Sequence, residues 1–153
     1  MFAPFGAVLR HRPAAALGTL LGLAIGFVAA PAFAAYHYSD HTSFNSNGTN
    51  YENVSGVSDN SRDSATVIYR ISAGNTAAGR MGARARVYLA NGDACAISST
   101  SFNPAPATSW SDNSPYSIGA CSGNHYAKGA TETWNGSGFD FVSTKRTVNV
   151  YLF

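Results

Sequence analysis

Two arginines and a tyrosine alternate along one short segment and have the chemistry of an anion-binding surface. Arg84, Arg86 and Tyr88 are spaced two residues apart, and side chains with that spacing point to the same face of a β-strand. A guanidinium group donates two parallel hydrogen bonds to a carboxylate or a phosphate, and an aromatic ring can stack on it. The segment predicts either an anion-binding face or a solvated face whose arginines pair with acidic residues on adjacent strands.

Aromatic residues later in the chain offer a second surface. Tyr126 and Trp134 belong to a segment in which Lys128 and Glu132 occupy the same alternation. Because charged side chains favour solvent, the rings on that face should be exposed and would suit stacking on sugar rings. The alternative is that these rings fill the core. The candidate ligand-binding residues are therefore Arg84, Arg86, Tyr88, Tyr126 and Trp134.

Acid–base and metal chemistry have weaker support. Glu132 and Asp140 flank one expected hairpin and are the one carboxylate pair that would suit glycoside hydrolysis, with His125 as a further acid–base group. Serine is common in this chain, but no Gly-x-Ser-x-Gly motif marks a nucleophile. His37 and His41 would hold a metal only with a third ligand that their spacing does not supply. We assign no catalytic residue, no metal ligand and no cofactor.

The two cysteines indicate a disulfide. Cys95 and Cys121 are the only cysteines of the chain, and no Cys-x-x-Cys motif occurs. This spacing is a poor zinc or redox motif, whereas an even number of cysteines in an exported chain predicts disulfide pairing. We expect one bond between them.

The first residues have the pattern of an export signal. Arg10 and Arg12 precede the apolar run Ala14–Ala30, and the small-x-small motif Ala32–Ala34 follows it. These features predict a secretory signal peptide over residues 1–34, cleaved near Ala34. The alternative is a retained membrane anchor, against which stand Pro31 and the lack of a basic cluster after the run.

Removal of that segment changes the charge balance. The chain has ten basic and eight acidic residues, giving a net charge of +2, and Arg10 and Arg12 are two of the basic ones. The remaining residues 35–153 therefore carry eight of each sign. A neutral chain does not favour nucleic-acid binding, and we expect no membrane contact after cleavage. The oligomeric state is left open.

The elements that would position these residues are strands. Residues 35–153 are rich in Ser, Thr, Asn, Gly, Tyr and Val and lack helical periodicity. Segments such as Ala65–Ser72, Arg80–Ala90, His125–Trp134 and Thr147–Phe153 alternate or lie between Gly- and Asn-containing turns. We predict one all-β domain, an antiparallel β-sandwich or small barrel of about seven strands. Phe102–Pro115, with its prolines, is expected to be a long surface loop.

One hairpin can be assigned a register. The turn Asn91–Asp93 follows the arginine-bearing segment. A three-residue loop would pair Leu89 with Cys95 and Val87 with Ile97, which keeps apolar residues opposite apolar ones. This register directs Cys95 into the core.

The segment Gly79–Cys95 resembles a pattern in small exported bacterial proteins, in which a glycine-rich strand ends in Arg-x-Tyr before an Asn-Gly turn and a cysteine. The glycine-bearing aromatic strand Tyr126–Trp134 and the turn Asn135–Phe139 match later parts of that pattern. Those relatives are uncharacterised β-rich proteins, so the resemblance implies export and a shared fold and carries over no activity.

These observations favour a non-enzymatic extracellular binding module for an envelope or matrix component, a glycan being one such polymer. The first alternative is a secreted effector, either an antimicrobial toxin or an inhibitor that presents Phe102–Pro115 to a secreted hydrolase. A small hydrolase using His125, Glu132 or Asp140 is the third.

Overall fold

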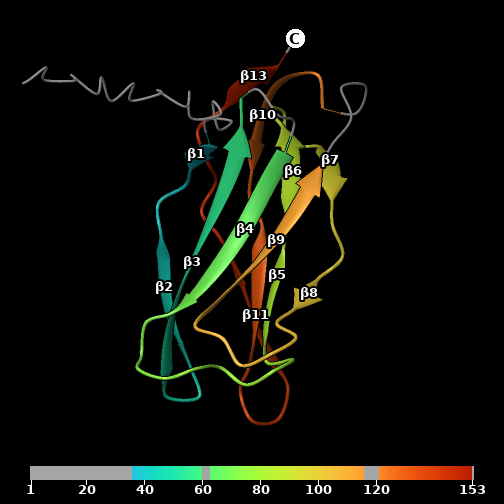
Figure 1. Cartoon of the computed structure of the whole chain (residues 1–153). Coiled ribbons are helices and arrows are strands. Elements are labelled where there is room, and N and C mark those ends of the chain that lie inside the picture. Colours follow the sequence, from blue (N-terminus) through green and yellow to red (C-terminus); the bar gives the residue numbers. More distant parts are fainter. Residues whose placement is uncertain (1–35, 60–62, 116–120, 153) are drawn as a thin grey trace, which may run out of the picture. The chain divides into compact units, whose positions relative to one another are not determined.

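The computed structural model describes residues 36–59, 63–115 and 121–152, and every regular element in these ranges is a β-strand (Figure 1). The expected signal segment, residues 1–34, lies outside the described residues. No described part of the chain forms a helix that could span a bilayer. The prediction of an all-β antiparallel fold is confirmed, since every strand pair is antiparallel.

Five strands form the front sheet. Its order is β1-β3-β4-β9, and β2 pairs with β3. The strands are β1 (Tyr36–Tyr38), β2 (Thr42–Ser46), β3 (Thr49–Ser58), β4 (Asp63–Arg70) and β9 (Ser109–Pro115). Because β9 accounts for half of Phe102–Pro115, the expectation of a long surface loop there is wrong. Its serine- and asparagine-rich residues continue the sheet by pairing with β4.

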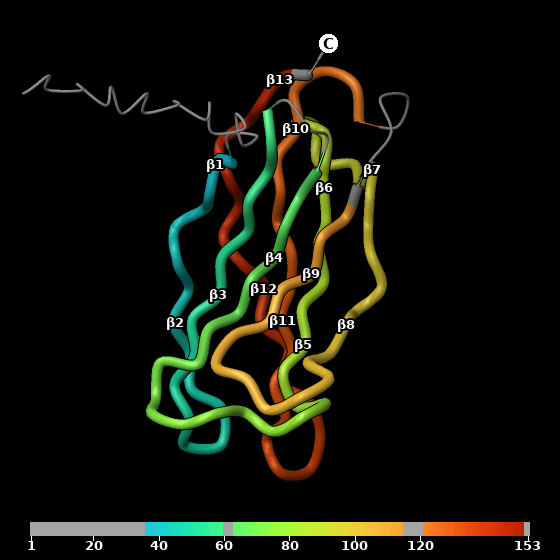
Figure 2. Tube along the Cα trace, in the orientation of Figure 1, coloured from blue at the N-terminus to red at the C-terminus, as the bar shows by residue number. Residues whose placement is uncertain are grey.

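The back layer consists of two four-stranded sheets whose strands follow one another end to end (Figure 2). One has the order β13-β10-β6-β7 and the other β12-β11-β5-β8. The first comprises β6 (Arg86–Leu89), β7 (Ala94–Ile97), β10 (Gly123–Ala127) and β13 (Val150–Leu152). The second comprises β5 (Met81–Arg84), β8 (Ser101–Phe102), β11 (Ala130–Trp134) and β12 (Phe139–Ser143).

The described residues thus form thirteen strands, where about seven were expected. The difference arises partly because long alternating segments are interrupted. Ala85 separates β5 from β6, and Lys128 and Gly129 separate β10 from β11. Each alternating segment was expected to be one strand, because alternation does not reveal where hydrogen bonding is broken.

The expected register of the β6–β7 hairpin is also wrong. Arg86 pairs with Ile97 and Val87 with Ala96, and a register shift lies between Val87 and Tyr88. An extra residue in one strand forms a bulge of this kind and moves every later pair by one position. Pairs on both sides of the shift differ from the expected ones, and the charged Arg86 lies opposite the apolar Ile97, so apolar matching does not predict the pairing of this hairpin.

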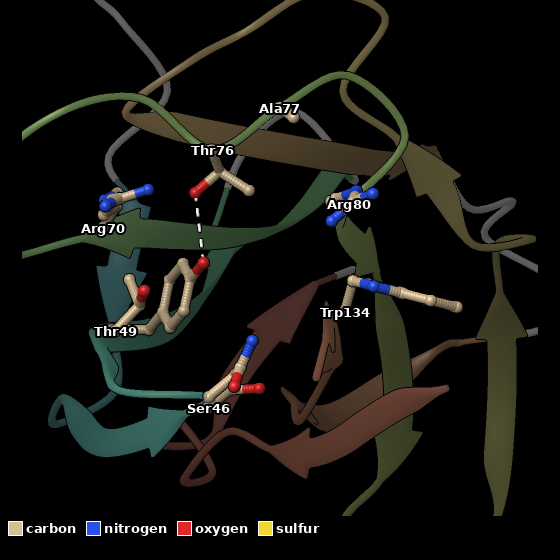
Figure 3. Close-up of a pocket in the computed structure, with 9 residues that line it drawn as sticks. Ser46, Thr49, Arg70, Thr76, Ala77, Arg80 and Trp134 are labelled. Atoms are coloured by element: carbon tan, nitrogen blue, oxygen red, sulfur yellow. Dashed lines mark hydrogen bonds between the residues drawn. The ribbon is translucent and has the colours of Figure 1, made fainter. Parts of the chain in front are cut away.

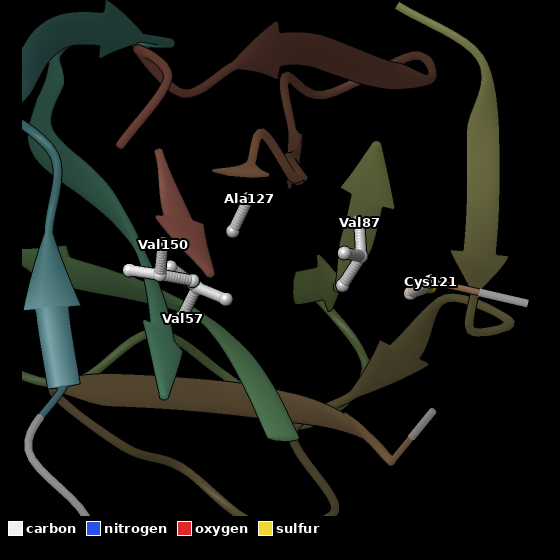
Figure 4. Close-up of a cluster of buried hydrophobic side chains, with 5 residues drawn as sticks. All are labelled: Val57, Val87, Cys121, Ala127 and Val150. Carbon is white, nitrogen blue, oxygen red and sulfur yellow. The ribbon is translucent and has the colours of Figure 1, made fainter. Parts of the chain in front are cut away.

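The core contains two apolar clusters on either side of a polar layer. Figure 4 shows the first cluster, which consists of Val57, Val87, Cys121, Ala127 and Val150. The second consists of Tyr51, Ile68 and Met81. On β3 the polar layer separates Tyr51 from Val57, and along β5 and β6 it separates Met81 from Val87.

Ser55 is the centre of this polar layer. Its Oγ lies 3.1 Å from Thr66 Oγ1 and 2.7 Å from Thr144 Oγ1, and it accepts a 2.8 Å hydrogen bond from the Gly129 amide. Asp112 extends the layer by accepting a 3.1 Å hydrogen bond from the Ala85 amide. We call these residues the polar belt. It joins the front sheet to the back layer at the two places where the back strands are interrupted.

The predicted disulfide between Cys95 and Cys121 is confirmed, with a Cα–Cα distance of 5.4 Å. Cys121 is buried in the first apolar cluster, and Cys95 is partly buried against it. The bond therefore ties β7, at the edge of the back layer, to the segment before β10.

We predict that Gly129→Ala destabilises the protein by about 2–3 kcal/mol. A Cβ atom at Gly129 would lie 1.8 Å from Thr66 Oγ1 and 2.7 Å from the Arg84 carbonyl oxygen, so the two sheets would have to separate. Gly138→Ala is the matched control, since a Cβ there meets no atom within 4 Å. Chemical denaturation measures both free energies of unfolding, and equal values would contradict the prediction.

Replacement of both Cys95 and Cys121 by serine should lower the free energy of unfolding by about 3–4 kcal/mol, because the bond restricts the unfolded chain. Denaturation of the oxidised protein, the reduced protein and the double variant measures the effect. The reduced protein and the variant should agree. A variant as stable as the oxidised protein would refute the expected contribution.

Candidate functional site

The arginine-bearing strand presents one face to the core and one to solvent. Met81, Ala83 and Val87 are buried, whereas Arg84 and Arg86 alternate with them and are only half-buried. The outward positions of β5 and β6 therefore lie on the side of the back layer that faces away from the front sheet.

Tyr88 and Tyr126 form a stacked pair on this side. They are cross-strand partners on β6 and β10, and their ring centroids are 5.5 Å apart with planes inclined by 17°. The guanidinium carbon of Arg146 lies 4.0 Å from the centroid of the Tyr126 ring. Arg146 Nη2 also donates to Asn149 Oδ1 at 2.6 Å, which fixes the guanidinium above the ring.

A second cation lies over an aromatic ring nearby. The guanidinium carbon of Arg86 is 5.5 Å from the ring centroid of Phe141, and Phe141 is 52% exposed. Arg84 is anchored differently, because its Nε donates to the Ser98 carbonyl oxygen at 2.8 Å.

Aromatic rings span the other end of this side. Trp134 and Phe139 are cross-strand partners in edge contact, 5.3 Å apart, and the centroid of Phe102 lies 5.0 Å from that of Phe139. The Phe102 ring covers Gly82, where a Cβ would lie 2.7 Å from it. The guanidinium carbon of Arg80 is 5.5 Å from the Trp134 ring centroid. Strands β8, β11 and β12 each contribute one ring to a continuous group, and the segment before β5 contributes the Arg80 cation.

We call this surface the arginine–aromatic face. It contains all five candidate ligand-binding residues from the sequence, Arg84, Arg86, Tyr88, Tyr126 and Trp134, together with Arg80, Phe102, Phe139, Phe141 and Arg146. Two of the added residues were missed in the sequence analysis. Phe141 lies beyond the turn Asn135–Phe139, in a strand whose bounds were not predicted, and Arg146 precedes β13 in an irregular segment.

No described arginine forms an ion pair with a described carboxylate. The ion pairs within the described ranges are His37–Asp59, His41–Glu52 and Lys145–Asp40. Glu132, the acidic residue on the arginine–aromatic face, accepts a hydrogen bond from Thr100 Oγ1 at 3.0 Å. The alternative in which the arginines pair with acids on adjacent strands does not hold for the described residues. The face thus has four arginines, Arg80, Arg84, Arg86 and Arg146, and one carboxylate, Glu132, although residues 35–153 carry equal numbers of basic and acidic groups.

The residues considered for catalysis are not brought together. His125 is buried in the core, with its Nδ1 2.9 Å from the Gly123 carbonyl oxygen. Glu132 pairs with Phe141 and faces outward, while Asp140 pairs with the buried Thr133 and faces the front sheet. These carboxylates lie on opposite sides of one sheet, so they do not form the pair that glycoside hydrolysis requires.

The histidines considered for a metal site have separate partners. His37 Nε2 lies 3.3 Å from Asp59 Oδ2, and His41 Nδ1 lies 3.0 Å from Glu52 Oε2. The described residues contain no group of three or more His, Cys, Asp or Glu side chains that would hold a metal ion.

Asp140 connects the front sheet to the β11–β12 hairpin. It accepts hydrogen bonds from Ser46 Oγ at 2.6 Å and from Asn135 Nδ2 at 2.7 Å. These two donors stabilise the carboxylate and hold the pKa of Asp140 below its usual value, the Ser46 hydroxyl contributing most.

Comparison with known proteins returned no matching family model, curated protein or solved structure.

We predict that Asp140 stabilises the protein above about pH 4 and that this contribution disappears in more acidic solution. The folded-state pKa is depressed, so the contribution is present above the unfolded pKa and is lost as the pH falls through the folded pKa. Asp140→Asn should melt at a lower temperature than the wild type at pH 6, and the difference should shrink toward about pH 2. Asp93→Asn, in an exposed turn, controls for net charge. A difference independent of pH would contradict the prediction.

Proposed function

We propose that this protein is an exported, non-enzymatic binding module for an acidic polysaccharide, held on the arginine–aromatic face. The observation that carries the proposal is that three guanidinium groups, those of Arg80, Arg86 and Arg146, lie over aromatic rings on one sheet face without a carboxylate partner among the described residues.

The contacts leave the cations able to bind. A ring beneath a guanidinium restricts its motion, so less conformational entropy is lost when an anion binds. The planar group still presents N–H donors at its edge, which match a carboxylate or a sulfate in a bidentate arrangement. The face therefore has cationic groups that are already positioned for an anionic ligand.

The aromatic residues favour a sugar polymer as that ligand. Phe139 and Phe141 are 42% and 52% exposed, and they stand on the same strand two residues apart. Exposed rings between cations can pack against the apolar faces of sugar units while the arginines bind their acid groups.

Export is part of the proposal. The signal-peptide pattern at residues 1–34 predicts it. The Cys95–Cys121 disulfide is compatible with an extracytoplasmic location, where disulfides persist.

The test measures binding of the purified protein to polygalacturonate, alginate and chondroitin sulfate, with dextran as the neutral control and single-stranded DNA as the non-sugar polyanion. We expect saturable binding to at least one acidic polysaccharide that weakens with salt, and no binding to dextran. Arg86→Gln and Phe141→Ala should each weaken it about tenfold, since each removes one charged or apolar contact.

Lys145→Gln is the matched control, because it removes one positive charge whose partner is Asp40 rather than an aromatic ring. Its affinity should stay within about twofold of the wild type. Equal weakening by Lys145→Gln and Arg86→Gln would show that net charge alone drives binding and would overturn the proposed site. Tighter binding to DNA than to every acidic polysaccharide would overturn the proposed ligand.

A further inference from the structure

A small polar pocket lies at the end of the sandwich where the β2–β3 turn and the loop before β5 meet (Figure 3). Its volume is about 160 Å³, which is smaller than the roughly 300–1,000 Å³ of a site for a drug-sized molecule. Arg80 and Trp134 belong both to its lining and to the arginine–aromatic face. The remaining lining residues are Ser46, Asn47, Thr49, Tyr51, Arg70, Thr76 and Ala77.

Two guanidinium groups border this pocket, and both are positioned by protein contacts. Arg70 donates from Nε to the Ser72 carbonyl oxygen at 3.3 Å and from Nη1 to the Asn75 carbonyl oxygen at 2.8 Å. Its Nη2 has no hydrogen-bond partner among the described residues. Arg80 lies over the Trp134 ring on the other side of the pocket (Figure 3).

Asn103 holds the backbone on which Arg80 stands. This buried side chain accepts hydrogen bonds from the Arg80 and Met81 amides at 3.1 and 2.9 Å. Its Nδ2 donates to the carbonyl oxygens of Thr76 and Ala77 at 3.2 and 2.9 Å. The buried Asn103 side chain therefore holds the backbone of Thr76 and Ala77, which line the pocket, and also the backbone of Arg80.

The pocket has no negative charge of its own. None of its lining residues is acidic. Asp140 accepts a hydrogen bond from the lining residue Ser46 but is itself outside the lining. Two cations beside one cavity repel each other, and an anion bound between them would relieve that repulsion. The charge arrangement thus favours a small anionic group.

The other lining groups indicate which anion. The Tyr51 and Thr76 hydroxyls share a 3.1 Å hydrogen bond, and each oxygen retains further acceptor capacity. Ser46, Asn47 and Thr49 add further polar side chains. Such a lining matches the several hydroxyls of a sugar ring.

We propose that this pocket binds the terminal sugar-acid unit of the polysaccharide, with Arg70 and Arg80 on its carboxylate. The inference rests on the proposed function, because Arg80 and Trp134 connect the pocket to the arginine–aromatic face. It adds to that function the selective binding of the end of a polysaccharide chain. The protein would then bind a cut or terminal chain more tightly than the interior of a long one.

The experiment titrates the isotope-labelled protein with galacturonate and with glucuronate and follows amide and side-chain NMR signals. We expect the largest shifts at Thr76, Ala77 and the Trp134 indole, and no such shifts with galactose or with the methyl ester of galacturonate, which lack the carboxylate. A short peptide with a free carboxy terminus is added as a separate titration. Stronger binding of the peptide than of either sugar acid would overturn the ligand assignment.

Variants separate the pocket from the face. Arg70→Gln should weaken galacturonate binding about tenfold and should weaken a short acidic oligosaccharide by a similar factor. Lys145→Gln, outside both the pocket lining and the arginine–aromatic face, should leave galacturonate binding unchanged. Because Arg70 also bonds within its own loop, Tyr51→Phe is the second variant, which keeps the ring and removes one hydroxyl from the pocket. It should also weaken galacturonate binding, and unchanged binding in both variants would overturn the pocket site.

The two proposals fail in different ways. If acidic polymers bind and depend on Arg86 while the sugar acids shift no pocket signal, the chain-end site is overturned and the proposed function stands. If no acidic polymer binds, the proposed function is overturned, and the chain-end assignment with it.

Discussion

The hydrogen bond from the Gly129 amide to Ser55 Oγ is the contact on which the two layers depend. It joins a break in the back layer directly to the middle of β3, and Ser55 also contacts Thr66 and Thr144. Glycine is required because the Thr66 hydroxyl occupies the space of a Cβ. An amide freed from strand pairing would be costly if buried without a partner. The polar belt supplies that partner, and the apolar clusters pack on either side of it.

The interruption of the back strands also shapes the arginine–aromatic face. Ala85 leaves the ladder, and its amide bonds to Asp112 and Ser98. Arg84 and Arg86 stand on either side of this break, so they take different partners despite their equal spacing in sequence. Arg84 bonds to a backbone carbonyl and Arg86 lies over Phe141. The contact between Arg86 on β6 and Phe141 on β12 crosses this break, so the face continues from one back sheet to the other.

The distribution of charge over the protein depends on the groups to which the carboxylates are hydrogen-bonded. Asp112 bonds in the polar belt and Asp140 bonds between Ser46 and the β11–β12 hairpin. Glu52 accepts from Ser43 and contacts His41 on the front sheet. Acidic groups serve the packing of the layers and the front surface, while the described arginines are held by rings and carbonyl oxygens. A chain of balanced composition thereby acquires one face on which arginines outnumber carboxylates.

The sequence by itself determined the all-β class, the disulfide and which residues share a face, because strand alternation and cysteine pairing are local or pairwise properties. Alternation placed Arg84, Arg86 and Tyr88 on one side of their strand, and likewise Tyr126 and Trp134 on theirs. Only the tertiary structure decided that these two sides coincide, that Phe139, Phe141 and Arg146 join them, and that the strands break at Ala85 and Gly129. It also made about half of Phe102–Pro115 strand and shifted the hairpin register. These outcomes depend on hydrogen bonds and close approaches between segments distant in sequence, such as Gly129 with Ser55, to which no local pattern is sensitive.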